Sequence, residues 1–412
     1  MTLSQDILQK NKSMDPRSIP PRRVLLFGST THILSDLFFA LLIPLLPTIK
    51  NDLQLSYTEI GMLRSAFSGA SAVLQIPAGF LAEHIGEFWM LLGGNVWVSI
   101  GLIGMAVMPG FWSLISMTII GGLGGGTQHP LASSMVSRAY ESSGRSSAVG
   151  TVNFAGDLGK MLAPASAAGL LLFGTWRTAL WVVGALGLFF MAAGIPLKNK
   201  LDLGKPLQQV SSSITEQSGS ESKLSGFIVL TVIGILDNAV RNGALILFPF
   251  ILIERGMTEG QITLMLFLLF AGGAAGKYVC GWLDERVGTV PLIWLTKGMT
   301  AALLISTLVA PAISLWPLAL ILGVGLNGTS SVLYATVAKF IPAQRRARYY
   351  GYFYTTNEIG TVGAPLAYGL IADQMGLRTS ILIMGVVTSL ILPASLALSK
   401  HLKEESKTLH GF

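Results

Sequence analysis

The sequence repeats itself: the hydrophobic layout of residues 24–197 recurs in residues 224–400. The motif GFLAEHIG at 79–86 returns as GWLDERVG at 281–288, an offset of 281 − 79 = 202. A second motif, DLG at 157–159, returns as EIG at 358–360, an offset of 358 − 157 = 201. Each copy holds six long apolar segments, which is too large for the unit of a solenoid. The repeat therefore predicts two six-helix halves related by pseudo-symmetry.

The composition places these segments in a lipid bilayer. Hydrophobic residues make up 51% of the 412 residues and charged residues only 12%, with a mean hydropathy of +0.62, whereas soluble domains have about a quarter charged residues. A helix needs about 20 apolar residues to cross a bilayer. The sequence thus predicts an all-α membrane protein with twelve transmembrane helices, at 24–49, 57–82, 88–109, 111–139, 146–173, 176–197, 224–253, 259–283, 289–310, 312–341, 348–373 and 378–400.

The distribution of Lys and Arg predicts the orientation in the membrane. Segments on the side of the amino terminus carry most of the 28 Lys and Arg residues, and the opposite segments carry only Lys50, Arg177, Arg255 and Arg378. By the positive-inside rule we expect both termini in the cytoplasm, in a multi-pass protein of the cell (inner) membrane. The net charge of +7 is then a signal of topology, so nucleic acid is not an expected partner. The predicted units are a cytoplasmic tail at 1–23, halves at 24–197 and 224–400, a cytoplasmic linker at 198–223 and a second tail at 401–412.

Several charged side chains fall inside the predicted spans, where each costs about 2.5–3.5 kcal/mol to insert. Such groups are expected to face an aqueous cavity or to pair with one another. Lys277 and Lys297 lie nearer to span ends, where a Lys can also extend its ammonium group to the membrane interface. Arg64 lies one to two turns from the outer end of its span and is placed for a gate, for the same interface or for contact with a ligand. The full set is Arg64, Lys160, Arg241, Lys277, Lys297, Asp36, Asp157, Asp237 and Glu358.

The spacing of these groups puts them on single faces of helices, because residues three, four and seven apart share a face. His32 and Asp36 are four apart in the first span, and Asp237 and Arg241 are four apart in the seventh. The first pair has no cation on its own helix, and a carboxylate beside an imidazole is expected to bind and release a proton. For the second pair two interpretations remain open: a structural ion pair, or a direct contact with a substrate or proton.

A third polar stripe lies in the fifth span and is repeated in the eleventh. Asn153, Asp157 and Lys160 share one face, and the repeat maps this face onto Tyr354, Glu358 and Thr361. Asp157 and Lys160 are again either a structural ion pair or part of a binding site. Both stripes are expected to face the pseudo-two-fold axis between the halves, because exposing charge to acyl chains is costly.

The repeated motif resembles the cytoplasmic signature of the major facilitator superfamily, in which it forms part of the inner gate. The resemblance covers the whole chain, since both halves carry the motif, and it implies two six-helix halves around a central cavity and transport by alternating access. In the first copy His84, Glu87 and Phe88 stand where the family usually has basic residues, so the usual charge relay is not expected there. The signature residues are Gly79, Glu83, Gly86, Gly281, Glu285, Arg286 and Gly288.

The first half is also similar to the fosmidomycin-resistance-like branch of this superfamily. The likeness rests on His32-x-x-x-Asp36, on GGGTQHP at 124–130, on Gly144-Arg145 and on the small residues of 153–164. That branch includes exporters of anionic or amphiphilic compounds. Two signatures of proton antiporters are missing or altered, because no Arg precedes Gly121 and Ala163 replaces a Gly before Pro164. His129, next to Pro130, is interpreted either as a cavity residue or as a polar group at a helix kink.

We therefore expect a secondary active transporter, proton-coupled and specific for a small organic anion. The spans hold one more cation than acids, and a fixed guanidinium or ammonium compensates a carboxylate or phosphonate. Alternatives are proton-driven efflux of amphiphilic drugs or antibiotics, and a non-transporting membrane receptor or lipid-handling protein. The expected partners are the small molecule, protons and the lipid bilayer, and the expected state is a monomer. Proton-coupling candidates are His32, Asp36, Asp157, Asp237 and Glu358; substrate-binding candidates are Arg241, Lys160, His129, Gln128, Asn153, Tyr354, Asn238 and Lys297.

The sequence gives no indication of catalysis or of a cofactor. The Gly-rich run at 121–126 is not preceded by a strand or followed by Lys-Ser or Lys-Thr, so it is not a nucleotide-binding loop. Glycine in a membrane helix instead allows close helix packing. The sequence shows no metal-ligand spacing and no nucleophile with a general base, and Cys280 is the single cysteine. We expect neither an enzyme nor a bound metal.

Overall fold

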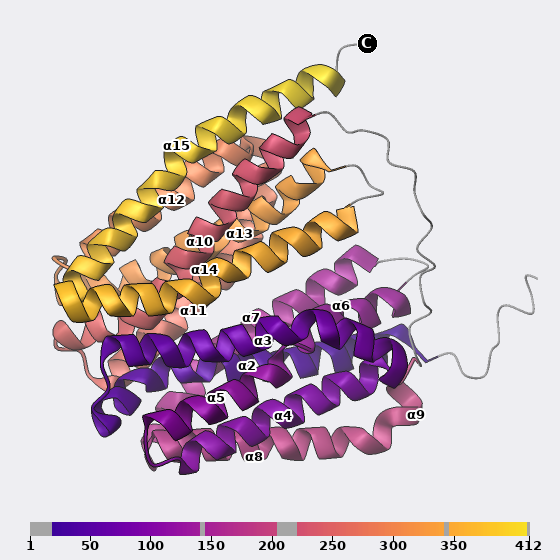
Figure 1. Ribbon diagram of the computed structural model, residues 1–412, viewed down its shortest axis with the longest axis vertical. Coiled ribbons are helices and arrows are strands. Elements are labelled where there is room, and N and C mark those ends of the chain that lie inside the picture. Colours follow the sequence, from indigo (N-terminus) through magenta and orange to yellow (C-terminus); the bar gives the residue numbers. More distant parts are fainter. Residues whose placement is uncertain (1–18, 141–144, 204–220, 342–345, 410–412) are drawn as a thin grey trace, which may run out of the picture.

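Residues 19–140, 145–203, 221–341 and 346–409 are described by a computed structural model of the chain. Figure 1 shows two helical bundles, the first in indigo to magenta and the second in pink to yellow. The first half comprises α2 (Pro21–Leu53), α3 (Tyr57–Ile85), α4 (Glu87–Val107), α5 (Phe111–Gly125), α6 (Gln128–Ala139), α7 (Arg145–Leu171), α8 (Trp176–Gly194), η1 (Ile195–Leu197) and α9 (Lys198–Leu201). The second comprises α10 (Glu221–Glu254), α11 (Glu259–Val287), α12 (Thr289–Ser306), η2 (Ala312–Ser314), α13 (Leu315–Phe340), α14 (Arg346–Met375) and α15 (Leu377–Leu409).

The predicted fold of twelve membrane-spanning helices in two halves is confirmed. Among the described residues, nine helices are long and apolar enough to cross a membrane by themselves. The other predicted spans are α7, α14 and the pair α5 and α6. Some boundaries differ: α9 lies within the predicted linker, and α15 continues to Leu409, past the predicted end at 400. Most of the predicted linker and tails, at 1–18, 204–220 and 410–412, lie outside the described residues.

The predicted span 111–139 is two helices, α5 and α6, with a break at Gly126 and Thr127. Pro130 has no N–H to donate to the carbonyl of Gly126, so the α-helical hydrogen bonding cannot continue through this turn. The backbone tightens instead, with Thr127 N–H donating to Gly124 O at 3.4 Å. The helix is therefore interrupted one turn before the proline that follows His129.

The repeat is also visible in how the helices begin and end. Ser56 caps α3 in a capping box, and Thr258 caps α11 in the same way, an offset of 258 − 56 = 202. The last glycine of each signature ends the same two helices with positive φ, 99° at Gly86 and 88° at Gly288. Side chains rarely adopt this conformation, so the motif needs glycine at these two positions.

Glycines of α5 allow it to pack closely against its neighbours. A Cβ at Gly126 would lie 2.4 Å from the carbonyl oxygen of Ser71 in α3, and a Cβ at Gly101 of α4 would lie 2.3 Å from the Cα of Gly121. Both distances are shorter than any ordinary contact. The Gly-rich run therefore serves helix packing, as its place in a membrane span predicts.

The two halves meet along α3 with α14 and along α7 with α11. At one end the contact is tight: the Asp373 carboxylate of α14 accepts the backbone N–H of Tyr57 at 2.8 Å and of Thr58 at 2.7 Å, and Ser65 donates to the carbonyl of Val362 at 2.6 Å. These contacts join the amino-terminal part of α3 to the carboxy-terminal part of α14. We call this the closed end of the molecule.

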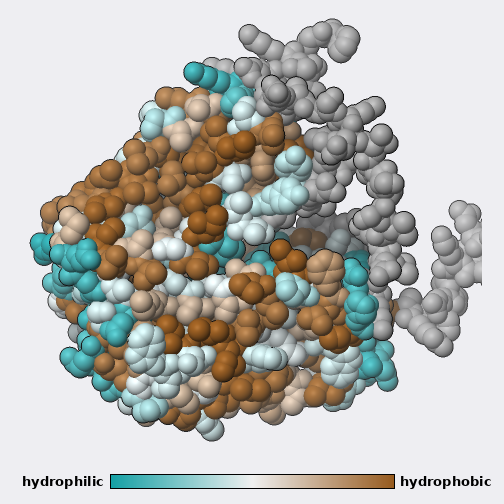
Figure 2. Space-filling view, in the orientation of Figure 1, coloured by the Kyte–Doolittle hydropathy of each residue, from teal (hydrophilic) through white to brown (hydrophobic). Residues whose placement is uncertain are grey.

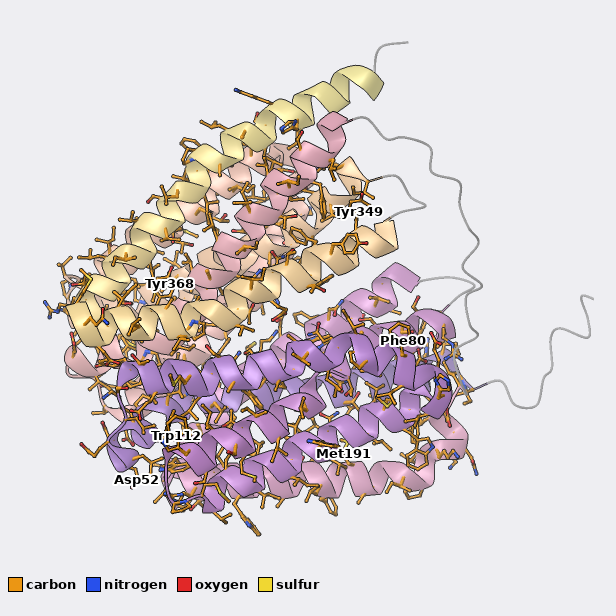
Figure 3. All side chains as sticks on the ribbon, in the orientation of Figure 1. Asp52, Phe80, Trp112, Met191, Tyr349 and Tyr368 are labelled. Atoms are coloured by element: carbon orange, nitrogen blue, oxygen red, sulfur yellow. The ribbon has the colours of Figure 1, made fainter. Side chains whose placement is uncertain are left out.

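The halves separate toward the opposite end, where Phe80 of α3 and Tyr349 of α14 lie on either side of the opening (Figure 3). Phe80 is 64% exposed there. Figure 2 shows a furrow between the halves, and it shows apolar side chains over the flanks of the bundles with hydrophilic ones gathered at the ends. This is the distribution expected of a protein whose flanks face acyl chains.

Candidate substrate and proton site

Asp36 of α2 is the centre of the polar cluster in the first half. Its side chain is only 5% exposed, and Lys160 of α7 places its Nζ 3.1 Å from Asp36 Oδ2. His32, one turn earlier on α2, has its Nε2 3.7 Å from the same oxygen. Asp36, which has no cation on its own helix, is thus paired with Lys160 from another helix. Lys160 therefore contacts Asp36 as well as Asp157.

The imidazole rings of His32 and His129 contact each other between α2 and α6. Nε2 of His32 lies 2.9 Å from Nδ1 of His129, a hydrogen bond in which one nitrogen must donate and the other accept. Nε2 of His129 lies 3.6 Å from Asp36 Oδ1, and the His129 side chain is 53% exposed, compared with 2% for His32. His129 therefore links the buried carboxylate to the accessible surface.

A glycine of α7 makes room for this cluster. A Cβ at Gly156 would lie 2.4 Å from Asp36 Oδ2 and 2.8 Å from His32 Nε2. No larger residue fits at this position without displacing the acid or the ring, and so α7 can approach α2 closely enough for Lys160 to reach Asp36.

Asp157 connects the first half to the second. Its Oδ1 lies 3.1 Å from Nζ of Lys160, and Lys277 of α11 donates to Oδ1 at 2.6 Å and to Oδ2 at 2.9 Å. Lys277 is thus held where the two halves meet. Its ammonium group does not extend to the membrane interface, which is one of the two positions that the sequence allowed. Asp36, Lys160, Asp157 and Lys277 form a row of alternating charges, which we call the charge ladder.

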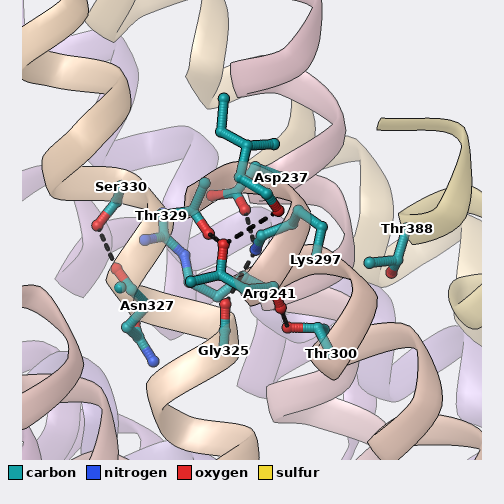
Figure 4. Close-up of polar contacts among 12 residues, drawn as sticks. Asp237, Arg241, Lys297, Thr300, Gly325, Asn327, Thr329, Ser330 and Thr388 are labelled. Carbon is teal, nitrogen blue, oxygen red and sulfur yellow. Dashed lines mark hydrogen bonds and ion pairs between the residues drawn. The ribbon is translucent and has the colours of Figure 1, made fainter. Parts of the chain in front are cut away.

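In the second half, Asp237 of α10 pairs with Lys297 of α12 (Figure 4). Both residues are 1% exposed, and Lys297 also donates to the carbonyl of Gly325 at 3.0 Å. Of the two interpretations of Asp237 and Arg241, the structural ion pair is not seen among the described contacts, in which Arg241 hydrogen-bonds Asn238. A fully buried carboxylate requires a cation in direct contact, and Lys297 enters from the neighbouring helix to provide it. The ammonium group of Lys297 is buried and, like that of Lys277, does not extend to the membrane interface.

The repeat relates the two buried acids, since 237 − 36 = 201. Asp237 pairs with the fully buried ammonium group of Lys297. Asp36 instead lies next to the imidazoles of His32 and His129 and the partly exposed ammonium group of Lys160. The second-half pair is therefore suited to holding helices together. The first-half acid is the one placed for exchange of a proton.

Glu358 of α14 lies in the field of two guanidinium groups, Arg241 of α10 and Arg64 of α3. Arg64 also donates to the carbonyl of Phe39 at 3.0 Å, which directs it inward and away from the span end. Arg241 further interacts electrostatically with Lys277. The two Arg residues and Glu358 come from both halves, and they continue the polar region of the charge ladder across the interface.

Tyr354 of α14 is half exposed and stacks on Tyr334 of α13, with ring centroids 4.5 Å apart and planes 22° from parallel. The Tyr334 hydroxyl also lies in the field of Arg241. An aromatic surface therefore lies beside a guanidinium group.

Gln128 and Asn153, two further substrate-binding candidates, differ in their surroundings. Gln128 is buried, accepts a hydrogen bond from Asn95 at 2.9 Å and donates to Thr31 at 2.9 Å, so it joins α2, α4 and α6. Asn153 is exposed on α7. The sequence analysis missed Asn95, although the repeat offers a signal for it: Asn95 is the counterpart of Lys297, at 297 − 95 = 202.

An ion pair lies at or next to each signature motif. In the second half Lys339 lies 3.6 Å from Asp284, while Arg286 stacks on the Trp282 ring at 3.8 Å. In the first half Arg138 pairs with Glu87 at 2.8 Å. Glu87, the first residue of α4, thus supplies an acid for an ion pair in the first half, although the basic residues usual in the family signature are absent there. The side chain of Glu285 lies outside the described residues. Among the contacts of the described residues, none involving Gly79, Glu83 or Gly281 tests their expected place in an inner gate.

The sequence showed no metal-ligand spacing, but the folded chain brings together potential ligand atoms. Those of His32, Asp36 and His129 all lie within 4.8 Å of one another. The cluster as a whole can hold protons on imidazole and carboxylate groups and can attract anions to Lys277 and Arg241.

Comparison with known proteins identifies the family. The sequence profile described as Major Facilitator Superfamily matches residues 29–220 and 227–410. The fosmidomycin resistance protein of Escherichia coli (strain K12) is 24% identical over 360 residues, covering 85% of this chain and 86% of its own. The 3-(3-hydroxy-phenyl)propionate transporter of the same organism is 25% identical over 303 residues, covering 71% and 73%. A solved bacterial homologue of the human lysosomal transporter Spinster superposes with a TM-score of 0.77 at 16% identity, covering 94% of this chain and 98% of the other.

Proposed function

Because this chain belongs to the Major Facilitator Superfamily, we propose that it is a proton-coupled transporter of a small organic anion that works by alternating access. The observation that best supports this proposal is the charge ladder. It joins an acid buried in the first half to an ammonium group of the second half through contacts of 2.6 to 3.1 Å. A change in charge at either end therefore alters the contact between the halves.

The anion would bind to cations on the second half. Lys277 and Arg241 come from α11 and α10 and lie close enough to interact electrostatically. A carboxylate that accepts hydrogen bonds from both would gain charge-assisted contacts. The stacked Tyr334 and Tyr354 rings beside Arg241 favour an aromatic or other planar group on the same molecule. The relative named for 3-(3-hydroxy-phenyl)propionate, an aromatic carboxylate, supports testing this class first.

The ladder couples proton binding to anion binding in a definite direction. A proton on Asp36 removes the negative charge that competes with Asp157 for Lys160. Lys160 then pairs with Asp157 alone, which weakens the hold of Asp157 on Lys277. Lys277 becomes available to an anion. Protonation and anion binding therefore favour each other, as they do in a symporter.

The two ends of the molecule fit one state of an alternating-access cycle. With both termini in the cytoplasm, as the Lys and Arg distribution predicts, the separated ends of α3 and α14 face the cytoplasm and the end capped by Asp373 faces outward. The outward-open state then requires the hydrogen bonds of Asp373 to break. Lys277 and Asp157, which lie between the halves, are placed to respond to the same movement.

Binding measurements on purified protein test this proposal. A thermal-shift screen of carboxylates identifies the ligand, and its affinity is then measured at about pH 5 and about pH 8, a range that includes the unperturbed pKa of histidine and approaches that of aspartate. We expect tighter binding at the lower pH and a loss of binding in Lys277→Gln. Lys200→Gln, which changes an exposed Lys outside the site, is the matched control. Equal affinity at both pH values would contradict the coupling.

Drug efflux is the second candidate function, and the similarity to the fosmidomycin resistance protein favours it. The same screen separates the two functions. Stabilisation by amphiphilic drugs that carry no anionic group, insensitive to Lys277→Gln, would support efflux and would leave the charge ladder without a role in substrate binding.

A further inference from the structure

We propose that His32, Asp36 and His129 form a binding site for one divalent transition-metal ion, such as Zn²⁺ or Co²⁺. Each residue offers a ligand atom, and all three atoms lie within 4.8 Å of one another. They come from two helices, α2 and α6. His129 lies 93 positions after Asp36, from 129 − 36 = 93, so no short sequence motif contains all three residues.

The ligand atoms lie near the separations that tetrahedral coordination requires. Bonds of about 2.0–2.1 Å at tetrahedral angles place neighbouring ligand atoms about 3.3 Å apart. His32 Nε2 lies 2.9 Å from His129 Nδ1 and 3.7 Å from Asp36 Oδ2, and His129 Nε2 lies 3.6 Å from Asp36 Oδ1. The first and third distances involve different nitrogens of His129, and the second and third involve different oxygens of Asp36. With one ligand atom from each residue the separations stay within 4.8 Å, so binding one ion requires the His129 ring and the Asp36 carboxylate to turn toward it. The ion would replace the proton that the two imidazole rings share.

The chemistry of the ligands selects the class of ion. Two imidazoles and one carboxylate suit Zn²⁺, Co²⁺ and similar ions, whereas Mg²⁺ and Ca²⁺ prefer sites made of oxygen. Access is provided by His129, whose side chain is 53% exposed while Asp36 and His32 are buried. Electrostatic neighbours of His129 include Lys160 of the first half and Lys277 of the second, so its open side faces the interface between the halves. Water would complete the coordination there.

Two features limit the affinity, and both give the proposal a specific signature. Lys160 Nζ lies 3.1 Å from Asp36 Oδ2, so the ion must bind beside an ammonium group that repels it and competes for the same carboxylate. Within the described part of the chain, Nδ1 of His32 has no hydrogen-bond partner, so the second-shell contact that strengthens many metal-bound imidazoles is missing. Removing the charge of Lys160 should therefore tighten metal binding.

Titration of the purified, tag-free protein in nanodiscs with Co²⁺ tests the site. Visible absorption reports tetrahedral coordination, and calorimetry with Zn²⁺ reports affinity and stoichiometry. We expect one ion per chain, a loss of affinity of at least about tenfold in His129→Ala, and a gain of at least about tenfold in Lys160→Met. His129 is exposed, so its replacement tests the site without disturbing the core. His84→Ala, at an exposed His outside the cluster, should bind as the unmodified protein does.

Three results would overturn the proposal: no saturable Co²⁺ binding, undiminished binding in His129→Ala, or binding in Lys160→Met that is no tighter than in the unmodified protein. None of these measurements involves transport. Absence of metal binding would therefore leave the proposed transport function untouched, and metal binding can be detected in a protein that does not transport the anion.

Discussion

Replacement of Asp373 by Ala should open the closed end of the molecule. The Asp373 carboxylate accepts hydrogen bonds from the backbone of Tyr57 at 2.8 Å and from the backbone and hydroxyl of Thr58 at 2.7 and 2.5 Å. It thereby caps the first turn of α3 from the other half of the protein. Alanine removes all three hydrogen bonds and the negative charge at the helix amino terminus, which are contacts that only the closed arrangement of the halves makes.

The size of the effect follows from these contacts. Each exposed hydrogen bond contributes about 0.5 kcal/mol, the low end of the usual net range, and a carboxylate at a helix amino terminus adds about 0.3–1 kcal/mol. The sum is about 2 kcal/mol. The equilibrium between the closed and separated arrangements of this end should therefore shift roughly 30-fold toward separation.

Distances between spin labels report this shift directly. Labels at Asn51 and Gly260, both exposed near the closed end, are introduced in a background in which Cys280 is Ser. We expect Asp373→Ala to add a population with a longer distance. Gln374→Ala, at the adjacent exposed position, should not. An unchanged distance distribution in Asp373→Ala would show that this cap does not hold the halves together.

Three further predictions address the charged residues inside the helices. Asp237→Asn leaves Lys297 buried without its partner and should lower stability by about 3–5 kcal/mol, seen as a lower thermal midpoint; adding Lys297→Met should restore the midpoint, and failure to do so would argue against a structural pair. Arg241→Ala should weaken anion binding about 10- to 150-fold with little change in thermal stability; the reverse pattern, measured by calorimetry and thermal unfolding, would assign Arg241 a structural role. In the Cys280→Ser background, Asn153→Cys should react with a water-soluble thiol reagent and Ala155→Cys, at a buried position, should not; equal labelling would place the polar face of α7 elsewhere.

The architecture could be predicted from the sequence because the bilayer imposes a simple rule. Each crossing needs a long apolar segment, and the offset of 202 between the two signature motifs shows how the segments are grouped. The same offset relates the capping boxes of α3 and α11 and the positive-φ glycines that end these helices. These features are local, so the sequence contains them completely.

The partners of the buried charges could not be predicted in the same way. Spacing along one helix allowed an ion pair between Asp237 and Arg241, but the cation in contact with Asp237 is Lys297 from another helix. Asp36 likewise receives Lys160 across a helix interface. A buried carboxylate takes whichever cation the tertiary packing brings within reach, and helix periodicity carries no information about neighbouring helices. The set of charged residues and the contact between Asp157 and Lys160 within α7 followed from the sequence, and the contacts between different helices did not.

The central claim is that a proton on Asp36 drives transport, and flux through proteoliposomes containing Asp36→Asn tests it most directly. The asparagine mimics the protonated acid, so Lys277 stays available to the anion while no proton is bound or released. Protein without the substitution should accumulate the anion when a pH gradient is imposed. Asp36→Asn should lose accumulation and still exchange labelled for unlabelled anion. Accumulation by Asp36→Asn that depends on the gradient as in the unmodified protein would contradict the claim.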